Sequence, residues 1–167
     1  IVATKARDVH AAAAIAQRLL APDGAVLAIQ NGLGSAERIA AALPGAHVLL
    51  GVIGGFGASM RGPGHAHHNG MEFLKLGEVA GGITPRLIAV AEIWRGAGFK
   101  VEAVPDIERL VWEKLICNVA FSGPCALTGR TIGEMLVDPD GWAISSACAM
   151  EAYAVARARL IAIGFDD

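Results

Sequence analysis

The pattern of apolar and polar positions divides the chain near residue 106. Before that point, short apolar runs alternate with segments of helical period. The predicted strands and helices follow one another at 1–4, 9–21, 25–29, 35–43 and 48–52. This β-α-β-α-β order predicts a parallel sheet with right-handed crossovers.

The two helices between these strands carry further local signals. Asp8 and Ser35 stand at their starts, and both side chains are predicted to act as N-caps. The first helix is expected to bury an apolar stripe through Ile15, Leu19 and Leu20.

The segment 51–82 is rich in glycine and has no helical period. Extended pieces near 55–60, 65–68 and 72–76 are predicted to add strands at the edge of the sheet. Pro85 is expected to open a helix to about residue 97, followed by a short strand at 100–103.

After residue 106 the pattern is helical. Helices are predicted at 107–121, with a continuation past a distortion at Gly123-Pro124, at 131–136 and at 139–163. The last helix is expected to pack through the apolar stripe Ala147, Met150, Ala154, Ala158 and Ile161. The fold class is therefore the back part of a Rossmann-like α/β domain with a parallel sheet (1–105), followed by the start of an all-α domain (106–167).

Composition narrows the function classes. The net charge is −2, which gives no electrostatic argument for binding nucleic acid or an anionic membrane. No uncharged apolar run is long enough for a spanning helix. Cys117, Cys125 and Cys148 lie in apolar helical contexts and are expected to be core residues in a reducing compartment. With no signal peptide in the sequence, a cytoplasmic location is expected.

The chain opens on Ile1, in what is predicted to be a strand already under way. We therefore expect these 167 residues to be part of a longer protein.

Two strand ends carry residues suited to binding a ligand. Lys5 follows the first strand and Asn31-Gly32-Leu33-Gly34 follows the second. Ligands of open parallel sheets bind outside the carboxyl ends of the strands, and glycines let a ligand approach the backbone. The alternative is that both are ordinary strand ends, since Asn-Gly is a common turn.

Lys114, Asn118 and Ser122 are spaced four residues apart, so one face of a helix carries an ammonium, an amide and a hydroxyl. Such a row can hold an oxygen-rich substrate, and the lysine can protonate a developing alkoxide. The alternative is a solvated stripe with a snorkelling lysine, and spacing alone does not separate the two. The packed side is expected to hold Leu110, Leu115 and Val119.

Other chemistries find less support. His65, His67 and His68 are not accompanied by a cysteine or carboxylate cluster, so no metal site is predicted. Cys117 has no paired histidine that would make it a nucleophile. No Gly-x-Gly-x-x-Gly fingerprint occurs, because the glycines at 51–57 do not open a helix.

Five motifs in fixed order resemble the ketopantoate reductase (2-dehydropantoate 2-reductase) family. They are Ala3-Thr4-Lys5-Ala6, Gln30-Asn31-Gly32-Leu33-Gly34, Gly62-Pro63-Gly64, Trp112-Glu113-Lys114-Leu115 with Asn118, and Ala126-Leu127-Thr128-Gly129-Arg130-Thr131. The resemblance implies NADPH-dependent reduction of 2-dehydropantoate to pantoate in pantothenate biosynthesis. It also implies that a Rossmann domain (1–105 being its C-terminal part) holds NADPH and that a helical domain like that of 6-phosphogluconate dehydrogenase closes the cleft.

The resemblance also implies residue roles on the substrate side. Lys114 is the expected proton donor to the ketone oxygen and helps to orient the substrate. Asn118 and Ser122 are expected to bind the substrate. Asn31 is expected to lie between the substrate and the cofactor.

On the cofactor side, the resemblance implies that Lys5 and Asn31 lie near NADPH. Ala58 corresponds to a backbone position that contacts the cofactor. No metal is implied, the partner is a small 2-oxo acid, and a homodimer is one candidate assembly.

Three departures from the family's pattern keep alternative functions open. The family's Gly-rich phosphate loop and its later helices are absent from these residues, so the polypeptide is expected to bind NADPH weakly. Ser122 stands where many members carry asparagine. The alternatives are a related reductase acting on another 2-oxo acid or an imine, and a non-catalytic remnant used for binding or dimerisation. The choice between NADPH and NADH also stays open.

Overall fold

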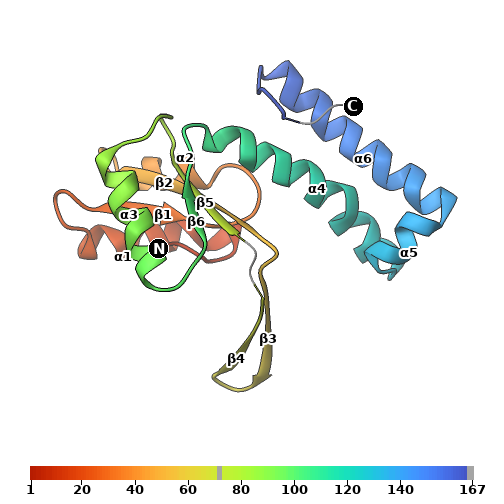
Figure 1. Ribbon diagram of the computed structural model, residues 1–167, viewed down its shortest axis with the longest axis horizontal. Helices are drawn as coiled ribbons and strands as arrows, with labels where there is room; N and C mark the ends of the chain where they lie inside the picture. The colour runs from red at the N-terminus through yellow and green to blue at the C-terminus, as the bar shows by residue number, and fades with distance from the viewer. Residues whose placement is uncertain (71–72, 165–167) are drawn as a thin grey trace. The chain divides into compact units, whose positions relative to one another are not determined.

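A computed structural model describes residues 1–70 and 73–164 (Figure 1). The helices are the 3-10 helix η1 (Ala6–Asp8), α1 (Val9–Leu19), α2 (Ser35–Ala42), α3 (Pro85–Gly96), α4 (Ile107–Thr128), α5 (Ile132–Val137) and α6 (Pro139–Ala158). The strands are β1 (Ala25–Ala28), β2 (His47–Gly54), β3 (Gly57–Gly62), β4 (His65–Gly70), β5 (Phe73–Glu78) and β6 (Val101–Ala103).

The main sheet is mixed, with four strands in the order β1-β2-β5-β6. The prediction of parallel pairing is confirmed for β1 with β2 and for β5 with β6. It is wrong for β2 with β5, which run antiparallel with Gly51 opposite Leu76. An antiparallel return needs no crossover helix, and the described part of the segment between these strands forms the β3–β4 hairpin.

The prediction of edge strands in the glycine-rich segment is wrong in two ways. β3 and β4 pair only with each other, as a separate two-stranded sheet. β5 lies inside the main sheet, between β2 and β6. Glu72, at the start of the predicted strand, lies outside the described residues. The predicted first strand is reduced to one parallel bridge between Val2 and Ala28.

Helices cover both faces of the main sheet (Figure 1). On one face, α1 and α2 pack on β1 and β2 through a core that includes Ala13, Val26 and Ile39. On the other face, α3 packs through a core that includes Leu27 and Leu87. Adjacent residues Val26 and Leu27 therefore enter opposite cores, as the alternation of a strand buried on both faces requires.

The predicted apolar stripe of α1 is confirmed for Leu20, which is half-buried against the core, and is wrong for Ile15 and Leu19. Its buried residues are Val9 and Ala13, whereas Ile15 is 63% and Leu19 80% exposed. Ala13 lets the helix approach the sheet closely, and Ile15 and Leu19 fall outside the contact.

Neither residue predicted as an N-cap forms a capping hydrogen bond with its helix. The side chains of Asp8 and Ser35 make no capping hydrogen bond. Ser35 is instead the first residue of α2, and Gly34 takes the cap position at a φ of 86°. By contrast, α3 begins at Pro85 as predicted, with Leu87 N–H donating to Thr84 Oγ1 at 3.0 Å.

The helical region is built largely as expected. α4 continues through Pro124 to Thr128, and α6 ends at Ala158, five residues before the predicted end. The predicted stripe of α6 is wrong, because its buried residues are Gly141, Ser145 and Ala156 while Met150 is 48% exposed.

The three cysteines are free thiols, and none forms a disulfide. The expectation that all three are core residues is wrong for Cys117, which is exposed. Cys125 and Cys148 are half-buried.

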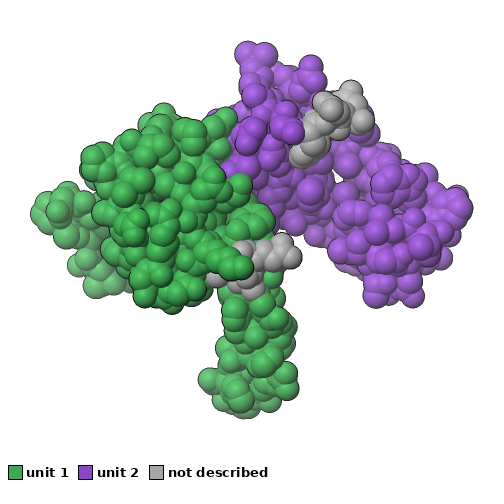
Figure 2. All heavy atoms as spheres, in the orientation of Figure 1, with its two compact units in different colours: residues 1–30, 34–107 green, residues 31–33, 108–167 purple. Residues whose placement is uncertain are grey.

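The chain forms two compact units, coloured separately in Figure 2. Unit 1 comprises residues 1–30 and 34–107, and unit 2 comprises residues 31–33 and 108–167. Within the described parts of the chain, no helix combines the length and the apolar character that crossing a bilayer requires.

Position 77 in β5 must be a glycine because Ile107, the first residue of α4, packs closely against it. A Cβ at Gly77 would lie 2.4 Å from Cβ of the buried residue Ile107. We predict that Gly77→Ala lowers the free energy of unfolding by about 1–3 kcal/mol, since an added methyl overpacks a closed contact. Chemical denaturation followed by circular dichroism measures this change.

The matched control is Gly96→Ala at the end of α3, where a Cβ meets nothing within 4 Å. It should leave stability unchanged or raise it slightly, because alanine favours the helix. Equal losses in both variants would show that the contact with Ile107 is not the cause.

Candidate active site on helix α4

Helix α4 has two chemically different faces. Trp112, Ile116 and Ala120 are its buried row, not the predicted Leu110, Leu115 and Val119, which are only half-buried. Lys114 is two residues from both Trp112 and Ile116, which places it about 200° around the helix from each. The lysine therefore lies on the side of α4 turned away from its packed row.

Polar contacts tie α4 to the segment that follows α6. The Arg159 guanidinium lies 5.8 Å from the centre of the Trp112 ring. The Gly164 N–H donates to Glu113 Oε1 at 2.7 Å, and Glu113 also pairs with Arg109. The carboxylate next to Lys114 in sequence is thus engaged by other groups.

Lys114 does not have the environment of an ordinary surface lysine. It and Asn118 are half-buried, while Ser122 is exposed. Partial burial removes water from the ammonium group and lowers the pKa of Lys114 below its ordinary value. An ammonium in this environment gives up its proton more readily than a solvated one.

The Asn31 loop belongs to the same compact unit as Lys114 and Asn118. Asn31 is exposed. Gly32 has a φ of 87°, and a Cβ placed there would meet nothing within 4 Å. The left-handed backbone explains the glycine, and the open space leaves room for a ligand.

Lys5 and Ala58 belong to unit 1 and are carried by different elements. Lys5 is exposed just before η1, where its carbonyl accepts the Asp8 N–H. Ala58 is exposed in β3 and is paired with His68 of β4. These positions stay predictions as cofactor contacts.

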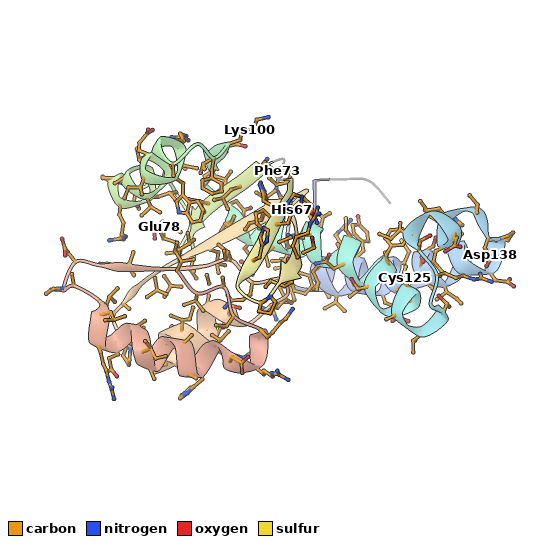
Figure 3. The ribbon with its side chains drawn as sticks, turned by 90° about the horizontal axis from the view of Figure 1, so that it is seen from below. His67, Phe73, Glu78, Lys100, Cys125 and Asp138 are labelled. Atoms are coloured by element: carbon orange, nitrogen blue, oxygen red, sulfur yellow. The ribbon has the colours of Figure 1, made fainter. Side chains whose placement is uncertain are left out.

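The histidines of β4 are exposed, and Figure 3 marks His67 among them. The His68 ring packs at 5.2 Å from that of Phe56. Over residues 1–70 and 73–164, no three His, Cys, Asp or Glu side chains gather in a way that could hold a metal ion.

Unit 2 also contains an apolar cavity of about 400 Å³ between α4 and α6. Its lining includes Phe121, Trp142 and Tyr153, but neither Lys114 nor Asn118. The cavity is therefore separate from the polar row.

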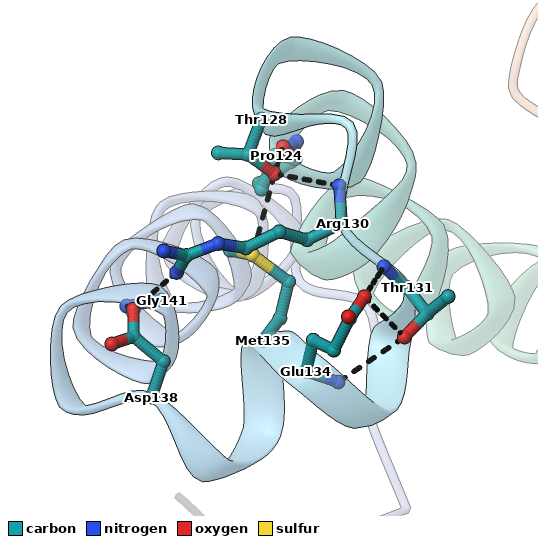
Figure 4. A network of polar contacts seen from close by, with 8 residues as sticks. All are labelled: Pro124, Thr128, Arg130, Thr131, Glu134, Met135, Asp138 and Gly141. Carbon is teal, nitrogen blue, oxygen red and sulfur yellow. Dashed lines mark hydrogen bonds and ion pairs between the residues drawn. The ribbon is translucent and has the colours of Figure 1, made fainter.

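The motif from Ala126 to Thr131 forms the corner between α4, α5 and α6 (Figure 4). Thr131 and Glu134 form a reciprocal capping box at the start of α5. Arg130 Nη1 donates to Asp138 Oδ2 at 2.6 Å, and that carboxylate also accepts the Gly141 N–H at 2.8 Å. This part of the motif therefore has a structural role.

No functional role was predicted for Gln30 itself, although it opens the motif Gln30-Asn31-Gly32-Leu33-Gly34. Its two amide atoms are both shielded from solvent, and neither has a hydrogen-bond partner among the described residues. Its position just beyond β1, beside Asn31, is the feature of the sequence that could have marked it as a candidate site residue.

Comparisons with known proteins point to one family. The family model "Ketopantoate reductase PanE/ApbA" matches residues 1–81, and the model of the C-terminal part of the same family matches residues 106–167. The chain is 32% identical to 2-dehydropantoate 2-reductase of Archaeoglobus fulgidus over 151 residues, which is 90% of this chain and 49% of that protein. The chain thus spans about half the length of the curated relatives it matches.

Solved structures give the same result. The PanE/ApbA family ketopantoate reductase from Ralstonia eutropha JMP134 aligns with a TM-score of 0.85 at 29% identity, covering 98% of this chain and 52% of that one. D-mandelate dehydrogenase with NADH aligns with a TM-score of 0.87 at 20% identity over 96% of this chain and 54% of that one, a likeness of fold alone.

Asp138 provides a pH-dependent test of the corner between α4 and α6. The Gly141 N–H first, and then Arg130, lower the pKa of Asp138. A carboxyl whose pKa is lowered by folding stabilises the fold above its unfolded pKa, and the contribution is lost as pH falls through the folded pKa. We predict that Asp138→Ala lowers the midpoint of thermal unfolding at neutral pH and weakens its fall in acid.

Asp140→Ala is the control, because Asp140 lies in the same first turn and makes no hydrogen bond or ion pair among the described residues. If both variants changed the thermal midpoint equally at every pH, the assignment of the cap to Asp138 would be wrong.

Proposed function

The chain belongs to the ketopantoate reductase family, and we propose that the protein containing it reduces 2-dehydropantoate to pantoate with NADPH. One structural observation supports the proposal in addition to family membership. Lys114 is half-buried, with a lowered pKa, on the unpacked side of α4, and Asn118 stands one turn further along. This arrangement favours proton donation over a solvated stripe.

In the proposed reaction, Lys114 provides the proton. A bound reduced nicotinamide cofactor supplies a hydride to the carbonyl carbon of the 2-oxo acid. As charge develops on the carbonyl oxygen, the ammonium of Lys114 stabilises it and transfers a proton to it. The product is the 2-hydroxy acid, and the neutral lysine recovers its proton from water.

Asn118 and Ser122 are proposed to hold the substrate. An amide offers donors to a carboxylate or ketone oxygen and an acceptor to a hydroxyl, whereas a serine offers one donor. Asn31 is proposed to contact substrate and cofactor together, and its exposure beside the open Gly32 supports this.

The cofactor is proposed to be held by Lys5, Asn31 and the backbone of Ala58. Two observations fit a polar ligand at the end of β1. The glycine loop has open space at Gly32, and the Gln30 amide lacks partners. NADPH is proposed over NADH on the resemblance alone.

A second candidate substrate is a different 2-oxo acid. Ser122 is exposed and shorter than the asparagine common at this position, which leaves more room at the end of the polar row. The fold is also shared with D-mandelate dehydrogenase.

Replacement of Lys114 tests the proton donor in the complete gene product. We predict that Lys114→Ala lowers kcat by roughly 100-fold or more, in line with the loss of a general acid. Lys114→Arg should also be slow, because an arginine keeps the charge but does not release its proton. Lys100→Ala, an exposed lysine before β6, should retain wild-type kcat.

A loss below tenfold in Lys114→Ala, with circular dichroism unchanged, would contradict the acid role. The pH profile gives a second check. Only the protonated lysine donates, so kcat should fall as pH rises through its pKa, and burial places this fall below the pH expected for a free lysine.

Ser122 is the predicted specificity position. Ser122→Asn should raise kcat/KM for 2-dehydropantoate relative to pyruvate by about fivefold, the value of one added hydrogen bond. Steady-state rates on both acids measure the ratio. An unchanged ratio would remove Ser122 from the substrate site.

A further inference from the structure

Gln30, a half-buried residue of unit 1, has an unsatisfied side-chain carboxamide. Its Nε2 and Oε1 atoms are both shielded from solvent without a hydrogen-bond partner among the described residues. A buried amide left unpaired costs about 1–3 kcal/mol, so native proteins rarely keep one without a reason.

The position of Gln30 points to a ligand. It lies two residues beyond the end of β1, whose neighbours Val2 and β2 both run parallel to it. Open α/β sheets bind their ligands beyond the carboxyl ends of parallel strands, so polar groups there are placed to contact a ligand. A second shielded polar group without a partner among the described residues, the Ser35 hydroxyl, lies at the other end of the same β1–α2 connection.

The side chain has the reach to meet such a ligand. Ala28 belongs to the core under α1 and α2, while Ile29 packs on the core under α3. Strand alternation therefore turns Gln30 toward the α1 and α2 side. Glutamine has three side-chain torsions, so a rotation can carry its amide from the enclosed position to a bound molecule, and the missing hydrogen bonds favour that change.

The chemistry of the amide selects between the two reactants. The keto-acid end of the substrate, which must face the nicotinamide, carries only acceptors, so this end can satisfy Nε2 but not Oε1. The nicotinamide end of the cofactor carries a carboxamide and ribose hydroxyls, which both donate and accept. We propose that Gln30 is a further cofactor-binding residue, whose carboxamide hydrogen-bonds the nicotinamide half of the cofactor. This inference rests on the proposed function.

The sequence offers a direct test, because it contains only two glutamines, Gln17 and Gln30. Gln17 is exposed on α1 and serves as the internal control. With 15N at glutamine side chains only, the Gln17→Met and Gln30→Met variants of the complete gene product identify the two pairs of amide signals. Millimolar NADPH should shift the Gln30 pair and leave the Gln17 pair in place. Adenosine 2′,5′-bisphosphate, which lacks the nicotinamide, and pyruvate should shift neither.

Binding is measured in parallel by the fluorescence of the reduced nicotinamide. Gln30→Met should weaken NADPH binding by at least about fivefold, whereas Gln17→Met should not change it. If NADPH binds while the Gln30 signals stay in place and Gln30→Met binds normally, the inference is wrong and the proposed function stands. If pyruvate alone shifts Gln30, the residue belongs to the substrate. If the complete gene product shows no NADPH binding, the cofactor proposal fails and this inference fails with it.

Discussion

The structure depends on one constraint, which is that helix α4 must bury an apolar row while holding a lysine partly out of water. The two demands are compatible because Lys114 lies on the side away from Trp112 and Ile116. Glu113, the carboxylate closest to the lysine in sequence, is occupied by Arg109 and the Gly164 N–H. Desolvation is thus the first cause acting on the pKa of Lys114, and it makes the ammonium a better acid.

The order of helices and strands was readable from the sequence, but the packed faces were not. Helices α1 and α6 are apolar over most of their circumference, so periodicity does not indicate which apolar side is covered. In both, the buried positions include small residues, such as Ala13 in α1 and Gly141 in α6. Close approach of backbones selects these residues, and it is a tertiary property absent from the hydrophobic pattern.

The site was predictable to the extent that its parts are local. The spacing of Lys114 and Asn118 fixes them to one face of a helix, and the glycine at 32 reflects its positive φ. Gln30 could not be found in this way, because an amide is conspicuous only once the fold has enclosed it without partners. The antiparallel placement of β5 was equally hidden, since strand direction follows from the connection and not from composition.

The most direct test of the central claim is a titration of the Lys114 side chain itself. With 13C-methylated lysines, nuclear magnetic resonance follows each amino group through its own pKa, and the Lys114→Arg variant assigns the signal. Desolvation on α4 predicts that Lys114 titrates clearly below the ordinary lysine value of about 10.4. A pKa for Lys114 at or above that ordinary value would contradict the account.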